Sequence, residues 1–130
     1  MEEFFVGQSD PFAKAVILVV DDEPLLRLLA VDMIENAGFE ALEADGSNEA
    51  IRILEAWLDI RIVFTDIDMP NGVDGLKLAA LIRDRWPPIA IIITSGKTAP
   101  LARDIPEGGL FFPKPYLPEE VTAAMRSMSA

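Results

Sequence analysis

The chain has 130 residues, of which 51% are hydrophobic and 25% charged, and its net charge is −11. This length and composition fit one globular domain with a single core and exclude a disordered chain. The chain has no cysteine and no histidine, which excludes disulfides, thiolate metal sites and imidazole chemistry. Fourteen of the acidic residues, against three basic ones, lie in the first sixty positions. An acidic surface repels phosphate backbones and anionic lipid, so we expect neither nucleic acid nor a membrane as partner.

The amino terminus begins MEEFFVGQSD, which is acidic where a secretory signal would be basic. The apolar runs elsewhere, such as AVILVV and IAIII, are too short to cross a bilayer. We therefore expect a cytoplasmic protein, with residues 1–14 as an N-terminal tail and residues 15–130 as the folded domain.

Apolar runs of strand length alternate with helical patterns along the chain. The first helical pattern begins at Pro24, which suits a first helical position, and Gly38 ends it. Two more patterns follow, and a last helix begins at Pro118 with acidic residues in its first turn. The expected strands are residues 15–20, 39–44, 60–65, 89–94 and 110–113.

This alternation, with two strands apolar throughout, predicts a parallel sheet covered by helices on both faces. Residues 39–44, FEALEA, alternate in polarity as an edge strand does. Right-handed crossovers then favour the strand order 2-1-3-4-5 of a doubly wound α/β domain. Pro100 and Pro106 leave little room for a fourth helix, so residues 97–108 predict a short or irregular element.

Polar side chains follow the strands where each one ends, and such ends form the ligand site of an open parallel sheet. Neighbouring carboxylates repel one another unless a hard divalent cation takes them as ligands, and Mg²⁺ suits such a set. One carboxylate can then attack phosphorus while the metal, a lysine and a hydroxyl neutralise the phosphoryl oxygens. The side chains concerned are Asp21, Asp22, Asp66, Asp68, Thr94, Ser95 and Lys114.

Four stretches, VVDDEP, TDIDMPNGVDG, IIITSG and FFPKPY, occur in this order. Together they resemble the receiver domain of bacterial two-component response regulators, from Ala15 to the end of the chain. The resemblance implies a flavodoxin-like fold in which Asp66 is the phosphoacceptor. It also implies that Mg²⁺ is bound by Asp22, Asp66 and the main-chain carbonyl of Asp68, with Asp21 acting through a metal-bound water.

The resemblance further implies that Thr94 contacts the phosphoryl group and that Lys114 forms a salt bridge with it. Phe111 matches the switch aromatic that reorients when Thr94 is drawn inward, and the Lys114-Pro115 peptide is expected to be cis. The chain departs from the usual pattern in three places: one extra residue between Pro70 and Gly75, a phenylalanine without a hydroxyl at 111, and the proline-bracketed segment 97–108.

By this resemblance the chain is a phosphoacceptor signalling domain that takes its phosphoryl group from a histidine kinase or histidine phosphotransferase. We expect no enzyme activity beyond self-phosphorylation from a phosphodonor and autodephosphorylation. The sequence does not identify the downstream protein, and it does not decide whether the chain forms a homodimer. No output domain is expected. A stand-alone receiver, a phosphate sink and an excised receiver of a hybrid protein fit the sequence equally.

Two alternatives belong to other classes. TDIDMP also resembles the Asp-x-Asp motif of haloacid-dehalogenase-type phosphatases, with Asp66 as nucleophile and Asp68 as general acid or base. Against this, the acidic pair precedes the nucleophile and no cap domain fits the length. A receiver-like binding module that never takes phosphate is opposed by the full set of acids, hydroxyl and lysine.

Overall fold

The computed structural model describes residues 14–69, 75–97 and 99–130. Most of the expected tail and most of the loop with the extra residue therefore lie outside the described residues. The strands are β1 (Val16–Val20), β2 (Glu40–Ala44), β3 (Ile60–Asp66), β4 (Ala90–Ser95) and β5 (Leu110–Pro113). The helices are α1 (Pro24–Asn36), α2 (Ser47–Ala56), α3 (Gly75–Arg85), the 3-10 helix η1 (Ala102–Asp104) and α4 (Pro118–Ser129).

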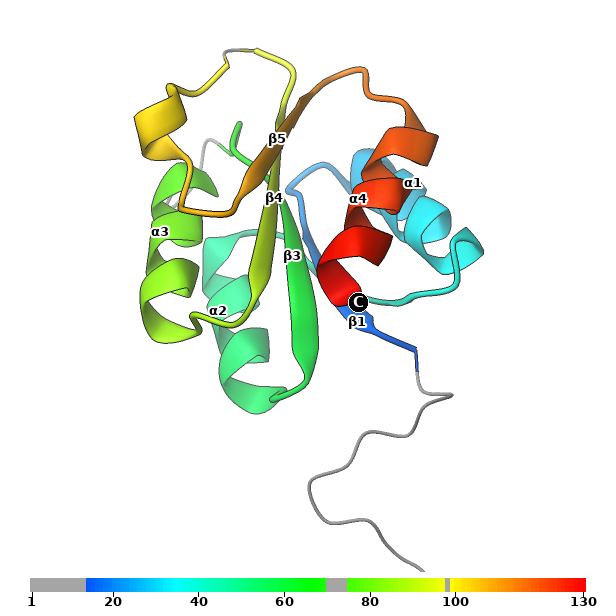
Figure 1. The fold of residues 1–130 in the computed structure, drawn as a ribbon, viewed down its shortest axis with the longest axis horizontal. Coiled ribbons are helices and arrows are strands. Elements are labelled where there is room, and N and C mark those ends of the chain that lie inside the picture. Colours follow the sequence, from blue (N-terminus) through cyan, green and yellow to red (C-terminus); the bar gives the residue numbers. More distant parts are fainter. Residues whose placement is uncertain (1–13, 70–74, 98) are drawn as a thin grey trace, which may run out of the picture.

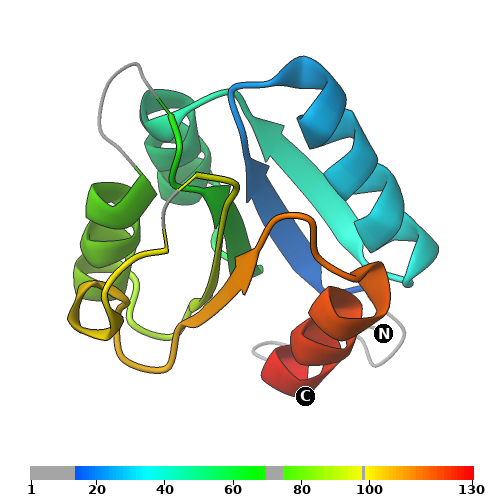
Figure 2. The same cartoon turned by 90° about the horizontal axis from the view of Figure 1, so that it is seen from above.

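The five strands form one parallel sheet in the order β2-β1-β3-β4-β5, which confirms the predicted topology. Helices α1 and α4 cover one face of this sheet, and α2 and α3 cover the other (Figures 1 and 2). The alternating strand β2 lies at one edge, as its pattern predicted, and the short β5 lies at the other. The domain is thus doubly wound, with β1 and β3 paired at the point where the strand order reverses.

Two apolar clusters lie on the two faces of the sheet, because successive side chains of a strand point in opposite directions. In β4, Ile91 and Ile93 belong to the cluster beneath α2 and α3, whereas Ile92 packs with Val121 and Met125 of α4. All five of these side chains are fully buried. The continuous apolar runs of the sequence are therefore explained by burial on both faces.

The helix ends follow the predicted signals. Pro24 and Pro118 begin α1 and α4, where a missing backbone N–H costs nothing. Gly38 adopts a positive φ of 97° just after α1, a conformation that favours glycine. Between β4 and β5 only the three-residue η1 forms, which confirms the expected short element. No helix in the described parts of the chain is long and apolar enough to span a membrane.

Candidate functional site

Three carboxylates meet at the carboxyl ends of the two central strands. Asp21 directly follows β1, Asp66 is the last residue of β3, and Asp22 lies beside them. One carboxylate oxygen from each residue lies within 4.8 Å of the other two. Asp21 and Asp66 are only 6% and 4% exposed, so water screens their mutual repulsion poorly. The sequence prediction that these strand ends converge is therefore correct.

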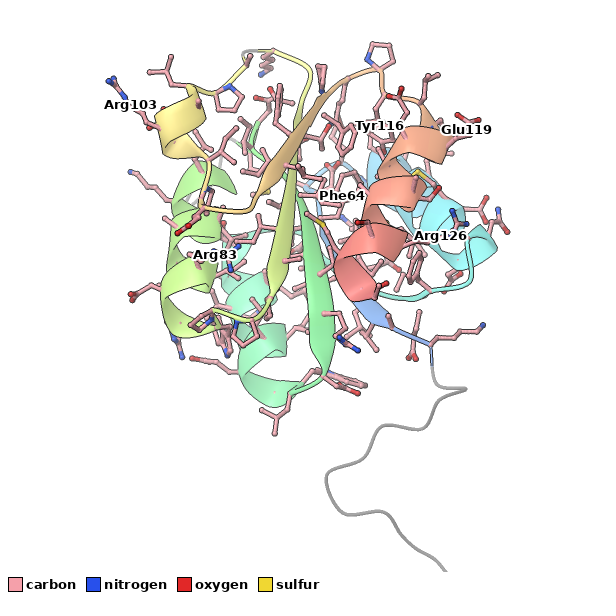
Figure 3. All side chains as sticks on the ribbon, viewed as in Figure 1. Phe64, Arg83, Arg103, Tyr116, Glu119 and Arg126 are labelled. Carbon is pink, nitrogen blue, oxygen red and sulfur yellow. The ribbon has the colours of Figure 1, made fainter. Side chains whose placement is uncertain are left out.

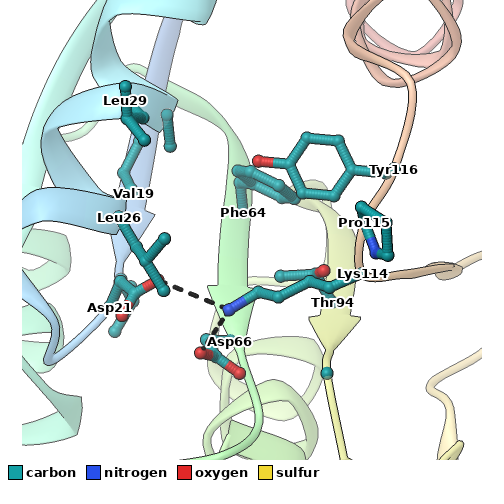
Figure 4. Close-up of a pocket in the computed structure, with 13 residues that line it drawn as sticks. Val19, Asp21, Leu26, Leu29, Phe64, Asp66, Thr94, Lys114, Pro115 and Tyr116 are labelled. Carbon is teal, nitrogen blue, oxygen red and sulfur yellow. Dashed lines mark hydrogen bonds and ion pairs between the residues drawn. The ribbon is translucent and has the colours of Figure 1, made fainter.

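Lys114 supplies positive charge to this cluster from the end of β5. Its Nζ atom lies 2.9 Å from Asp66 Oδ2 and 3.9 Å from Asp21 Oδ2 (Figure 4). The peptide that joins Lys114 to Pro115 is cis, as predicted. One ammonium facing three carboxylates leaves the cluster negative, and its donors are the hard oxygens that a small divalent cation prefers. The donor set therefore fits Mg²⁺.

The pKa values of two groups in this crowded cluster, Lys114 and Asp21, lie above their ordinary values. Burial lowers the pKa of the Lys114 ammonium, but the hydrogen bond to Asp66 and the charges of Asp66 and Asp21 raise it more, and the net pKa is above its ordinary value. Burial raises the pKa of the Asp21 carboxyl, and Asp66 and Asp22 raise it further against the opposing effects of the Glu23 amide and Lys114. Ionised Asp21 thus costs folding free energy, and its contribution to stability falls as the pH rises through its pKa.

Both oxygens of Asp66 accept hydrogen bonds, which fixes the orientation of this carboxylate. Oδ2 accepts from the Lys114 ammonium, and Oδ1 accepts from the backbone N–H of Asp68 at 2.8 Å. Asp66 is also paired in register with Thr94 of the neighbouring strand β4. The carboxylate is thus held in one orientation at the end of its strand.

The Thr94 hydroxyl is buried and has no hydrogen-bond partner among the described residues. Buried hydroxyls are normally paired, so an orphan beside a charged cluster calls for a ligand. Thr94 lines the same cavity as Asp21, Asp66 and Lys114 (Figure 4). An oxygen-rich anion seated in that cavity would satisfy the hydroxyl.

Phe111 and Phe112 point to opposite faces of the sheet. Phe111 is partly buried against the cluster beneath α2 and α3 and is paired in register with Ile93. Phe112 packs on the α1 and α4 face and is paired with Thr94. The default expectation that both phenylalanines pack in the core is correct, and the switch role of Phe111 stays a prediction.

The side chain of Asp68 lies elsewhere than in the acid cluster. Its carboxylate accepts hydrogen bonds from the Ser95 hydroxyl and from the backbone N–H groups of Gly96 and Lys97. Sequence reasoning predicted a role for its main-chain carbonyl and missed this contact. The sequence did hold a signal for this contact. Asp68 lies two residues beyond the end of β3, and Ser95 is the last residue of the strand that pairs with β3.

The cavity also has apolar walls that the sequence did not reveal. It measures about 430 Å³, and its walls include Leu26 and Leu29 of α1 together with Tyr116. The Tyr116 ring packs against Phe64 at a centroid distance of 5.8 Å and an interplanar angle of 72° (Figure 3). An edge-on pair of this kind stabilises the wall of the cavity.

Gly75 is a second residue that sequence reasoning did not use. A Cβ atom at this position would collide with the Asp66 carbonyl oxygen and with Ile67. The first turn of α3 therefore approaches the end of β3 more closely than any side chain permits. The missing side chain of Gly75 therefore allows α3 to pack close to the end of β3, which carries Asp66.

The chain thus combines a doubly wound α/β sheet with three carboxylates, a lysine and a buried hydroxyl without a partner among the described residues, all at the carboxyl ends of its strands. The family model of the response regulator receiver domain matches residues 17–126. The chain therefore belongs to the response regulator receiver family.

Relatives of two architectures match the chain. It is 35% identical over 119 residues to the chemotaxis protein CheY of Thermotoga maritima, covering 87% of this chain and 96% of that protein. It is 30% identical over 124 residues to the sensor kinase CckA of Brucella abortus, covering 92% of this chain but only 13% of the kinase. The chain thus spans nearly all of one relative and a small part of the other.

A solved structure agrees with this assignment. The response regulator receiver domain protein of Clostridium thermocellum superimposes with a TM-score of 0.79 at 31% identity. The match covers 88% of this chain and 93% of that one. The predicted family and fold are confirmed.

Proposed function

We propose that Asp66 accepts a phosphoryl group from the phosphohistidine of a histidine kinase or histidine phosphotransferase. The observation that carries this proposal is the pose of Asp66, hydrogen bonded to Lys114 beside the orphan hydroxyl of Thr94. Asp21, Asp22, Asp66 and the main-chain carbonyl of Asp68 would hold Mg²⁺, which supplies charge neutralisation at the phosphoryl oxygens when bound.

In the transfer step a carboxylate oxygen of Asp66 attacks phosphorus, and a new O–P bond forms. The P–N bond of the donor breaks, its electron pair stays on the imidazole, and the imidazole takes a proton from solvent. Lys114 and the Thr94 hydroxyl neutralise phosphoryl oxygens as negative charge builds up on them. In autodephosphorylation water attacks the same phosphorus, and inorganic phosphate leaves with the carboxylate of Asp66 restored.

The phosphatase alternative is disfavoured by the contacts of Asp68. A general acid or base must reach the reacting atoms, and its proton must be free to move. The Asp68 carboxylate is instead held by the Ser95 hydroxyl and the Gly96 amide. It is also not among the three acids whose oxygens meet at the site.

The output of the proposed switch is a protein-interaction face. Thr94 would move toward the phosphoryl group, and Phe111, on the neighbouring edge strand β5, would reorient in response. Support comes from the orphan hydroxyl of Thr94 and from the half-buried position of Phe111 at the edge strand β5. Identical NMR signals of the Phe111 ring before and after phosphorylation would exclude this part of the proposal.

The test is the intact mass of the protein after incubation with acetyl phosphate and Mg²⁺. We expect a gain of one phosphoryl group, and no gain when a chelator removes the metal. A protein that gains nothing but hydrolyses phosphate esters would be a phosphatase. No gain and no hydrolysis, with acetyl phosphate and with a panel of phosphorylated histidine donors, would favour the silent binding module.

The protein donor would approach over a row of exposed leucines on α1. Leu26 and Leu29 line the cavity that opens onto Asp66, and they are 39% and 56% exposed. A phosphohistidine must reach Asp66, so the surface around that histidine has to cover the rim of the cavity. Exposed apolar side chains at such a rim are typical of protein contact sites.

Replacing Leu26 and Leu29 by serine is expected to slow phosphoryl transfer from a protein donor by roughly tenfold or more, since two apolar contacts are lost. Uptake from acetyl phosphate should be unchanged, because this small donor needs no contact with α1. The control is Leu58→Ser, which alters a leucine that is 94% exposed beyond α2. Equal losses with both donors would show that the leucines shape the pocket and do not receive the partner.

A further inference from the structure

We infer that the Asp68 carboxylate is a positioning group that holds the segment after β4 in its unphosphorylated arrangement and releases it when Asp66 is phosphorylated. This inference rests on the proposed function, because it concerns how Asp66 chemistry is transmitted. We call Asp68 and its three donors, Ser95, Gly96 and Lys97, the Asp68 latch.

The latch is a compact set of hydrogen bonds. The Ser95 hydroxyl lies 3.0 Å and 2.9 Å from the two carboxylate oxygens of Asp68. The N–H groups of Gly96 and Lys97 donate to Asp68 Oδ2 at 2.9 Å and 3.3 Å. The Lys97 N–H also lies 3.2 Å from the Ser95 hydroxyl. A single carboxylate thus fixes the first turn of backbone beyond the end of β4.

The same residue contacts the phosphoacceptor. The backbone N–H of Asp68 donates to Asp66 Oδ1 at 2.8 Å. The backbone N–H of Ile67, between them, donates to the Thr94 carbonyl at 3.0 Å. Ile67 and Asp68, the two residues that follow β3, are therefore both hydrogen bonded to the end of β4, so a change at Asp66 reaches the latch directly.

Phosphorylation would oppose the latch in two ways. It changes the charge at Asp66 from −1 for the carboxylate to nearly −2 for the acyl phosphate, and the added charge repels the Asp68 carboxylate two residues away. It also adds oxygen acceptors that attract the Thr94 hydroxyl, which is buried without a partner. Because Ser95 follows Thr94 in the chain, an inward shift of Thr94 pulls the Ser95 hydroxyl away from Asp68.

The consequence is an equilibrium between two arrangements. In one, Asp68 accepts hydrogen bonds from the donors of residues 95–97; in the other, the phosphoryl group draws Thr94 in and these donors move away from Asp68. The latch therefore opposes phosphorylation, and a variant that weakens it should take up phosphoryl groups more readily. The released segment leads to η1 and to Ile105, which packs on the same apolar cluster as Phe111.

Ser95→Ala is the sharper variant, since it removes one latch donor and leaves every charge in place. Asp68→Asn is its companion and removes the charge. The readouts are amide hydrogen exchange at Gly96 and Lys97 and the affinity for beryllofluoride, a phosphoryl mimic, in the presence of Mg²⁺. Ser127→Ala, an exposed change on α4, is the control.

In the wild-type protein we expect the amides of Gly96 and Lys97 to exchange faster once Asp66 is phosphorylated. In both latch variants we expect fast exchange before phosphorylation and beryllofluoride affinity raised several-fold. A structural role alone would change exchange and leave the affinity unaltered. The inference is overturned if full phosphorylation, verified by mass, leaves wild-type exchange unchanged, or if Ser95→Ala leaves the affinity unchanged. No phosphoryl gain by the wild-type protein would instead overturn the proposed function and, with it, this inference.

Discussion

Asp66→Asn is expected to abolish phosphoryl uptake from acetyl phosphate. The asparagine side chain keeps an oxygen that can accept the Asp68 N–H, so the end of β3 should retain its backbone arrangement. Its amide lacks the negative charge and the nucleophilic oxygen that attack phosphorus requires. The loss should therefore be complete, while far-UV circular dichroism stays that of the wild-type protein.

The control for this variant is Asp104→Asn, an exposed aspartate of η1 whose charge change is the same. It should take up one phosphoryl group at the wild-type rate. Undiminished uptake by Asp66→Asn would contradict the proposal and point to another acid, which peptide mapping of the phosphorylated protein would identify.

Lys114→Met is expected to have the second largest effect, on uptake and on stability together. Removing the ammonium leaves the phosphoryl oxygens without this neutralising partner, so the uptake rate should fall by roughly a hundredfold. It also leaves the carboxylates of Asp66 and Asp21 facing each other without a cation. Because Lys114 is partly exposed, we expect a loss of about 2 kcal/mol in the free energy of unfolding.

Magnesium separates these two effects. A bound dication compensates the negative charge of the carboxylates, so the thermal unfolding temperature of Lys114→Met should rise when Mg²⁺ is added. The uptake rate should stay low. Lys14→Met is the matched control, because its side chain is exposed and it lies outside the site and the Asp68 latch. Equal destabilisation of Lys114→Met with and without Mg²⁺ would show that the lysine acts by packing and not by charge.

The sequence was sufficient for the sheet because its signals were local and strong. Residues 16–20 are apolar and buried throughout, residues 91–93 are three fully buried isoleucines, and burial on both faces of the sheet explains both runs. The acidic and basic residues of the site could also be predicted, since each directly follows a strand and the carboxyl ends of parallel strands lie together.

The contacts of Asp68 and the walls of the cavity could not be predicted, because they depend on contacts between distant parts of the chain. Nothing in the sequence around Asp68 distinguishes a carboxylate that faces the acid cluster from one that caps the end of β4, since both satisfy an aspartate in a turn. The cavity walls, Leu26, Leu29 and Tyr116, have the ordinary periodicity of packed residues. These side chains line one cavity because α1 and the segment after β5 lie on either side of it, and the sequence does not show this arrangement.

The salt bridge between Lys114 and Asp66 joins residues 48 positions apart in the chain. Neither residue can meet the other until β5 has docked on β4 and β4 on β3, because the sheet has the order β2-β1-β3-β4-β5. The proposed cation ligands Asp21, Asp22 and Asp66 lie at the ends of β1 and β3, so cation binding would favour any chain in which these two strands have paired, with or without β5. Metal titration during refolding should therefore report the pairing of β1 with β3, whereas formation of the Lys114 salt bridge reports the later docking of β5.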